Sequence, residues 1–293
     1  MRANKNKMKK GKNKFFIIAG LLIVAMIGVI GCGKEETESI NSEEEAVKVE
    51  TVKENENDFP YYYNEENEDR YKKYQNLNPD MDFEEVTWRV EADIDKPSYE
   101  ETTEISIDDE NDLTVLVNKH FVLRSDYEPA QLVELGGGYL VTPETKTAFD
   151  EMKSDAQNDG INLMYTSAYR SLDRQETLYN NYVVEDGQEN ADTYSARPGS
   201  SEHHTGRAID LVDETWDLMQ YEYSEDCQWI RDNCWKYGFI LRYGEDIVDI
   251  TGYMYESWHI TYVGEKAAKI MHDEGIEALE EYWVKYVKYS PEK

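Results

Sequence analysis

Basic residues are scarce in most of this chain, and cysteines are few. The 293 residues contain 31 Lys+Arg against 62 Asp+Glu. Seven of the bases lie in residues 1–31, which contain no acid, so the remainder has 24 bases against 62 acids, a net charge of −38. A nucleic-acid partner needs clustered Lys and Arg, so we expect none. Three cysteines are too few for a disulfide-built scaffold.

Long apolar runs are also lacking, with one exception near the start. Residues 15–30 carry no charged side chain. As a helix they would span about 24 Å, short of a hydrocarbon core of about 30 Å. The basic start, the short apolar run and Val29-Ile30-Gly31-Cys32, which resembles a bacterial lipobox, predict a lipoprotein signal peptide over 1–31 with lipidation of Cys32. The alternative is an uncleaved membrane anchor. Either one places the rest of the chain outside the cytoplasmic membrane.

Aliphatic residues are sparse in the stretch after this segment. Residues 33–70 contain fourteen acids and four bases. Such a composition buries too little apolar surface to offset the entropy of ordering, so we interpret 32–67 as an acidic, disordered spacer. It would hold a domain comprising 68–293 away from the membrane.

The domain mixes helix and strand signals without a βαβ repeat or a phosphate-binding glycine pattern. We therefore predict an α+β fold rather than a doubly wound one. Helices are predicted at 70–74, 83–86, 143–158, 174–182, 226–237 and 264–275, and strands at 87–94, 113–117, 161–166 and 239–243. Cys227 and Cys234 would lie about 10.5 Å apart on one helix, too far for a disulfide, so we expect two free packing residues.

Two short segments carry the residues suited to chemistry, 198–210 and 255–259. His203, Asp210 and His259 form a set of two imidazoles and one carboxylate, which suits one catalytic Zn²⁺ with an open position for water. Glu256 precedes His259 by three residues, so its carboxylate can face that water and act as general base. By composition alone, each of these residues could equally have a surface or capping role.

The spacing strengthens this assignment. The pattern S-x-H-x-x-G-x-A-x-D at 201–210, followed by E-x-W-H at 256–259, closely resembles the VanY-type D-alanyl-D-alanine carboxypeptidases of peptidase family M15, which belong to the LAS-type zinc peptidases. Further similar segments are 116–119, 126–129, 167–171, 237–243 and 251–254. The resemblance implies a small antiparallel sheet with flanking helices around a zinc site, as in hedgehog domains. It also implies that His203, Asp210 and His259 hold the zinc and that Glu256 is the catalytic base.

The resemblance assigns roles to four more residues. Arg170 matches the arginine that faces the scissile carbonyl or the terminal carboxylate, roles that suit a permanently charged, bidentate guanidinium. Gln175 and Ser201 match positions that hydrogen-bond the substrate, although Gln175 could instead be an exposed helix residue. Trp258 is expected to wall the pocket or to be ordinary core. The chain departs from the family at 257 and 261, where it has Ser and Thr instead of the frequent Pro and Arg.

The resemblance implies a zinc-dependent D,D-carboxypeptidase that removes the C-terminal D-alanine from peptidoglycan stem peptides. An L,D-carboxypeptidase acting on tetrapeptide stems is the alternative within enzymes, and a non-catalytic wall-binding lipoprotein is the alternative of another class. Retention of every ligand and of Glu256 argues against the last. We expect a monomer, anchored by its lipid to the outer face of the cytoplasmic membrane.

Overall fold

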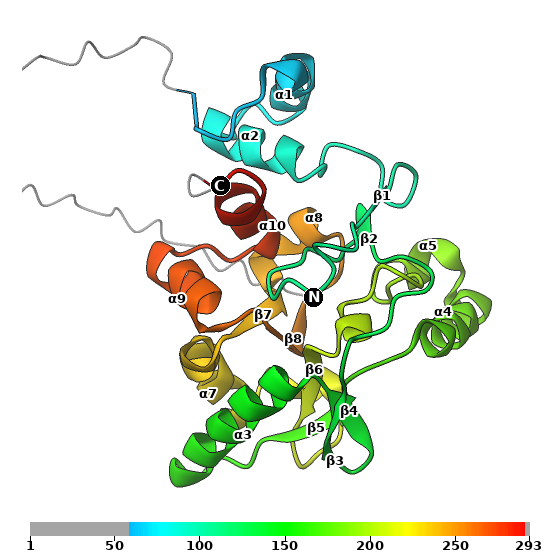
Figure 1. Cartoon of the computed structure of the whole chain (residues 1–293), viewed down its shortest axis with the longest axis vertical. Coiled ribbons are helices and arrows are strands. Elements are labelled where there is room, and N and C mark those ends of the chain that lie inside the picture. Colours follow the sequence, from blue (N-terminus) through cyan, green and yellow to red (C-terminus); the bar gives the residue numbers. More distant parts are fainter. Residues whose placement is uncertain (1–58, 291–293) are drawn as a thin grey trace, which may run out of the picture. The chain divides into compact units, whose positions relative to one another are not determined.

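The main feature of the fold is a four-stranded antiparallel sheet, seen in the computed structural model, which describes residues 59–290 (Figure 1). In spatial order the strands are β5 (Met164–Ser167), β6 (Ala208–Val212), β8 (Glu256–Tyr262) and β7 (Phe239–Tyr243). All five residues of β6 are buried, as expected for a central strand covered on both faces. The pairing of β6 with β8 sets Asp210 directly opposite His259.

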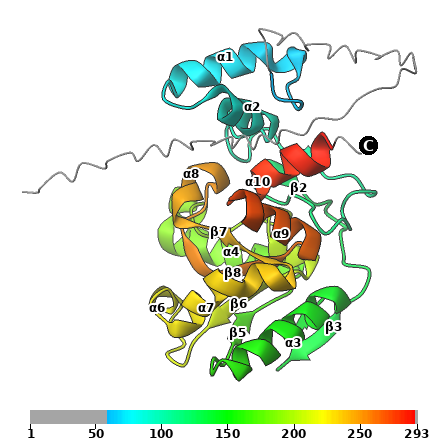
Figure 2. The same ribbon diagram turned by 90° about the vertical axis from the view of Figure 1, so that its left-hand side faces the viewer.

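Helices cover both sides of this sheet. Helices α7 (Glu225–Asn233) and α9 (Glu265–Glu274) lie on one side, and α4 (Leu172–Asp186) lies on the other (Figures 1 and 2). The main core includes Ile209 and Ile260 of the sheet, together with side chains of α7 and of α3 (Pro143–Asn158). Because successive side chains of a strand point to opposite faces, Asp210 and His259 point away from this core. The reactive side chains thus lie on the face of the sheet opposite the main core.

Shorter elements complete the described part. The remaining strands form a parallel pair, β1 (Thr103–Glu104) with β2 (Phe121–Val122), and a hairpin, β3 (Val133–Gly136) with β4 (Tyr139–Val141). The remaining α-helices are α1 (Glu68–Leu77), α2 (Phe83–Glu91), α5 (Gln188–Ala191), α6 (Leu218–Tyr221), α8 (Val248–Thr251) and α10 (Leu279–Tyr282). The 3-10 helices are η1 (Glu65–Asn67), η2 (Glu202–Thr205), η3 (Cys234–Tyr237) and η4 (Glu245–Ile247). The last element, η5 (Trp283–Lys288), is π-helical. Among the described residues, no helix has the length and hydropathy needed to span a bilayer.

Several predictions from the sequence pattern are confirmed, including the α+β class. Helix α3 occupies the predicted range, and the side chain of Thr142 caps it by accepting a hydrogen bond from the amide of Thr145. Strand β7 coincides with the predicted strand at 239–243. Cys227 and Cys234 are both buried and free, as their spacing predicted.

Two predicted strands are wrong. Residues 87–94 were expected to be extended, but most of them belong to α2. The local signals favour this helix, because Asp82 caps its first turn and Glu85 pairs with Arg89 four residues later. Residues 113–117 form no strand either. Their apolar character reflects burial of Leu116 and Val117 in a second core that includes α9 and α10.

The folded part begins earlier than the predicted boundary at residue 68. Tyr62 is buried against Trp88 of α2 and Val284 near the C-terminus. The ring of Tyr63 packs on Tyr71 of α1, with centroids 5.0 Å apart. These tyrosines anchor residues 59–67, so the expected spacer ends before residue 59. The predicted signal peptide at 1–31, Cys32 and the spacer up to residue 58 lie outside the described residues.

Candidate metal and catalytic site

Three segments bring the predicted metal ligands together. His203 lies in η2, Asp210 in β6 and His259 in β8, and all three side chains are buried. One potential ligand atom from each lies within 4.8 Å of the others. Gly206 connects η2 to β6 with φ of +70°, and a Cβ there would lie 2.8 Å from the side chain of Leu132. The tight turn that places His203 beside β6 therefore requires glycine.

Hydrogen bonds to the second ring nitrogen orient each histidine. His203 Nδ1 lies 2.7 Å from the carbonyl of Ala168, which leaves Nε2 facing Asp210 Oδ2 at 3.2 Å. His259 Nε2 lies 3.3 Å from the carboxylate of Glu202, which leaves Nδ1 facing Asp210 Oδ1 at 3.1 Å. Each imidazole therefore presents one nitrogen to a common point, with its other nitrogen held from behind.

Asp210 supplies the test of whether these residues suit a metal ion. Its Oδ1 is buried and makes no hydrogen bond, despite its nearness to His259. A buried oxygen without a hydrogen-bond partner is costly and rare, and a cation would satisfy it. Two imidazole nitrogens and a carboxylate oxygen match the donor set of a catalytic zinc site with an open position. The residues present therefore fit zinc.

Glu256 reaches this site through an irregularity in the sheet. Leu241 pairs with Ile260 and Tyr243 with Glu256, so two steps along β7 match four along β8. The extra residues place Glu256 on the same side as His259, with Oε2 3.8 Å from His259 Nδ1. Burial raises the pKa of Glu256 to about 7, with Asp210 adding to the shift and His259 opposing it. A carboxylate with a pKa near neutrality suits a general base.

Burial and neighbouring charges also shift the pKa values of the two histidine ligands. Burial, and then the charge of Arg170, lower the pKa of His203 to about 4. Burial opposes protonation of His259 too, but the adjacent carboxylates of Asp210 and Glu202 raise its pKa to about 9. The carboxylates that surround His259 therefore favour a positive charge at this position, and a metal ion can supply it.

Arg170 adds a cation beside the ligands. It donates from Nη2 to Asp210 Oδ2 at 2.7 Å and from Nη1 to Gln175 Oε1 at 3.3 Å. Gln175 is buried and donates to the carbonyl of Ala196. It does not line the cleft, so the structure gives it a role in holding Arg170 rather than the expected direct contact with substrate.

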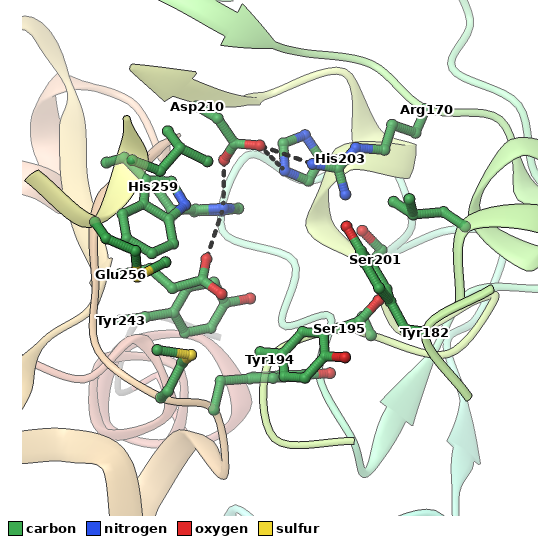
Figure 3. A pocket seen from close by; sticks show the side chains of 17 residues that line it. Arg170, Tyr182, Tyr194, Ser195, Ser201, His203, Asp210, Tyr243, Glu256 and His259 are labelled. Carbon is green, nitrogen blue, oxygen red and sulfur yellow. Dashed lines mark hydrogen bonds and ion pairs between the residues drawn. The ribbon is translucent and has the colours of Figure 1, made fainter. Parts of the chain in front are cut away.

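The ligands open into a cleft of about 340 Å³, shown in Figure 3. Ser201 and Trp258 line it, and Trp258 also belongs to the main core. Aromatic and thioether side chains form much of the remaining wall, including Tyr182, Tyr194, Tyr243, Met219 and Met254. The only carboxylates among the cleft-lining residues are Asp210 and Glu256, and the only guanidinium is that of Arg170.

Sequence reasoning missed Lys119, a buried residue that ties two walls of this cleft. Its Nζ donates to the carbonyls of Asp192 and Gly252, and it lies 4.2 Å from the centre of the Tyr253 ring. The segments that begin at these carbonyls carry cleft residues, among them Ser195 and Tyr253. Burial lowers the pKa of Lys119 to about 8. No local pattern indicates this role, because its partners lie far away in the chain.

His204, next to a ligand, has a structural role. Its Nδ1 lies 2.8 Å from the carbonyl of Arg170, and its Nε2 accepts a hydrogen bond from the amide of Gly199. The neutral ring thus joins two loops. Among the described residues, His204 does not belong to the group of potential metal ligands.

Known proteins are similar to this chain in sequence. A family model described as D-alanyl-D-alanine carboxypeptidase, VanY, matches residues 138–265, which include all the ligands, Arg170 and Glu256. The chain is 33% identical over 293 residues to “Putative carboxypeptidase YodJ” of Bacillus subtilis (strain 168), covering 96% of this chain and 100% of that protein.

Two solved structures are also similar. The LD-carboxypeptidase LdcB is 36% identical with a TM-score of 0.58, over 62% of this chain and 89% of that one. A vancomycin-resistance D,D-pentapeptidase, VanY, solved in complex with Zn(II), is 29% identical with a TM-score of 0.52, over 58% of this chain and 97% of that one.

Proposed function

Since the chain belongs to the VanY-type D-alanyl-D-alanine carboxypeptidases, we propose that it is a zinc-dependent D,D-carboxypeptidase that removes the C-terminal D-alanine from peptidoglycan stem peptides. The observation that carries this proposal is the convergence of His203, Asp210 and His259 with Glu256 beside them. The similar VanY pentapeptidase, which binds Zn(II), supports both the metal and the reaction.

Glu256 is the group that moves protons in this reaction. When bound, zinc polarises the scissile carbonyl and makes water a better nucleophile near neutral pH. Glu256 accepts the proton of the attacking water and then donates it to the amine of the departing D-alanine. Its burial, and hence its raised pKa, suits it to both transfers.

Arg170 is the group that binds negative charge on the substrate. A carboxypeptidase must recognise a terminal carboxylate, and Arg170 is the one guanidinium among the cleft-lining residues. Its planar fork can donate two parallel hydrogen bonds to such a group. Gln175 and Ser167 hold the guanidinium from behind, at 3.3 and 3.1 Å, so that it is oriented before substrate binds.

An L,D-carboxypeptidase is the second candidate. The similar structure of LdcB, an LD-carboxypeptidase, favours it. Both reactions release D-alanine and use the same proton transfers. They differ in the residue before the scissile bond, which is D-alanine in one case and an L-configured residue in the other.

Separate incubation of the full chain with pentapeptide and tetrapeptide muropeptides distinguishes the two. We expect mass spectrometry to show conversion of pentapeptide to tetrapeptide, with tetrapeptide unchanged. Conversion of tetrapeptide to tripeptide alone would replace the D,D assignment with the L,D one. No release of D-alanine from either, in a protein that retains zinc, would contradict a carboxypeptidase.

We also propose that lipid on Cys32 anchors the enzyme to the outer face of the cytoplasmic membrane. The support is the Val29-Ile30-Gly31-Cys32 sequence after a basic and then an apolar segment. Cys32→Ser should abolish labelling by a radioactive fatty acid in cells. Labelled lipid on that variant would contradict the lipoprotein assignment and favour a plain membrane anchor.

A further inference from the structure

A buried carboxylate lies directly behind the ligand His259. Glu202 Oε2 is 3.3 Å from His259 Nε2 and accepts a hydrogen bond from the hydroxyl of Thr261 at 2.5 Å. Its other oxygen, Oε1, accepts from Arg242 Nε at 2.6 Å. The two oxygens are thus divided, one facing the metal ligand and the other a guanidinium.

The rest of that guanidinium is occupied by a second carboxylate. Arg242 donates from Nη1 and Nη2 to the two oxygens of Glu280, at 3.0 and 2.6 Å. Asn118 also donates to Glu280, at 3.1 Å. Arg242 is 1% exposed and Glu280 is 0% exposed. A continuous line of buried groups therefore runs from His259 through Glu202 and Arg242 to Glu280.

This line ends in a helix that carries no metal ligand. Glu280 lies in α10, beyond residue 265, where the match to the family model ends. Glu202, by contrast, immediately precedes the ligand His203 in η2. These side-chain contacts connect α10 to the zinc site.

The hydrogen-bond donors of Arg242 are shared between two carboxylates, and this sharing keeps Glu202 in place. Both Nη groups of Arg242 donate to Glu280, and its Nε donates to Oε1 of Glu202. Oε2 therefore stays free to accept from His259 and Thr261. Without the charge of Glu280, the fork of Arg242 could bind both oxygens of Glu202, since bidentate pairing is the preferred geometry. Glu202 would then turn away from His259.

We propose that Glu202 is a positioning residue for His259 and that Arg242 and Glu280 hold it in place, so that α10 is part of the zinc site. A carboxylate that accepts from the second nitrogen of a histidine ligand fixes its tautomer and orientation, and its loss typically weakens metal binding by about 10- to 100-fold. The inference rests on the proposed zinc site and extends it to a segment without ligands.

Glu91 provides a matched control for burial and charge. It is also 0% exposed and paired with a cation, Lys288 at 2.8 Å. Its partners Asn67, Tyr71, Lys288 and Tyr289 are not cleft residues. Replacing Glu91 by Gln therefore removes a buried charge without touching the line that leads to His259.

The test is the zinc dissociation constant of the full chain, measured by competition with a chromogenic chelator, together with the thermal midpoint of the zinc-free protein. We expect zinc binding about 10- to 100-fold weaker in Glu202→Gln and Glu280→Gln, and unchanged in Glu91→Gln even if its midpoint falls. Unchanged affinity in both site variants would overturn the inference. Weakening in Glu202→Gln alone would refute the part assigned to α10.

Two milder variants keep the inference testable if those proteins do not fold. Thr261→Val removes one hydrogen bond to Glu202 and should weaken zinc binding a few-fold. Glu280→Asp keeps the negative charge but moves it away from Arg242 by the length of one methylene group, so it should also weaken zinc binding. Wild-type affinity in both would count against the inference. A wild-type chain that binds no zinc would instead contradict the proposed function, so the two failures are distinguishable.

Discussion

Two buried carboxylates show how a structural cluster differs from a functional one. Glu91 is the last residue of α2, and both of its oxygens accept hydrogen bonds, from residues near α1 and from residues near 288. The donors are Asn67 and Tyr71 to Oε1, and Lys288 and Tyr289 to Oε2. Asp210 is equally buried and also beside a cation, Arg170, yet its Oδ1 has no hydrogen-bond partner.

The difference is in what the surrounding side chains can donate. Around Glu91 each carboxylate oxygen accepts hydrogen bonds from two side chains, which donate from hydroxyl, amide or ammonium groups. Around Asp210, Arg170 and His203 face Oδ2, whereas the free oxygen Oδ1 faces an imidazole nitrogen of His259. We call Glu91 and its hydrogen-bond donors the closed cluster, because both carboxylate oxygens are hydrogen-bonded, and such a cluster stabilises the fold. We call His203, Asp210 and His259 the open cluster, because Asp210 Oδ1 can still bind an ion.

The largest expected effect comes from removing a ligand from the open cluster. His259→Ala leaves two protein ligands for zinc and removes the partner of Glu202, so zinc affinity and D-alanine release should be lost together. Elemental analysis of the purified variant and a D-alanine assay check this. Retention of one zinc per chain would show that His259 is not a ligand.

A smaller loss is expected from changing the cation beside Asp210. Arg170→Lys keeps the charge but cannot reproduce the contacts to Asp210, Gln175 and Ser167. We expect about 10²-fold lower kcat/KM with zinc content unchanged. Steady-state kinetics on pentapeptide, with zinc measured in the same samples, provide the check, and wild-type kcat/KM would remove Arg170 from substrate recognition.

The closed cluster should affect stability alone. Glu91→Gln leaves Lys288 and two tyrosines with a neutral partner, which should lower the free energy of unfolding by about 1–3 kcal/mol. Denaturant unfolding measures the loss, and kcat/KM at a temperature where the variant stays folded should equal that of wild type. A fall in kcat/KM under those conditions would break the distinction between the two clusters.

The smallest effect concerns pH and the buried Lys119. Its pKa is lowered to about 8 by burial, so between pH 8 and 10.5 the unfolded chain binds a proton that the folded chain has lost. This group should therefore make the protein more stable as pH rises through that window. The gain should total about 1–3 kcal/mol and be absent in Lys119→Met. Parallel pH slopes for the two proteins, measured by denaturant unfolding, would contradict this.

Local sequence predicted much of the fold and of the reactive groups. Helix α3 has its cap at Thr142 and its apolar spacing within one segment, so the pattern was sufficient. His203, Asp210, Glu256 and His259 were predicted because they lie in two short motifs with restrictive spacing. The structure supplied what spacing cannot, namely the pairing of Asp210 with His259 and the irregularity in β8 that turns Glu256 toward them.

The features that escaped prediction depend on contacts between distant segments. Charged residues are usually exposed, and Glu202, Arg242 and Glu280 are buried because η2, β7 and α10 pack together in the folded protein. No local pattern in the sequence indicates this packing. The tyrosines at 61–63 lie next to an acidic stretch, and only the distant partners Trp88 and Val284 show that Tyr62 belongs to the fold. The strand predicted at 87–94 failed because its alternation also fits a helix that is buried on more than one side.

The most direct test of the account is Glu256→Gln, with zinc content and D-alanine release measured on the same sample. The amide nearly matches the carboxylate in shape but cannot accept the proton of the attacking water, so release should fall about 10²–10⁴-fold. The zinc content should stay at one ion per chain, because His203, Asp210 and His259 are intact. Full activity in this variant, or loss of its zinc, would contradict the assignment of Glu256 as the base and of the other three residues as the metal ligands.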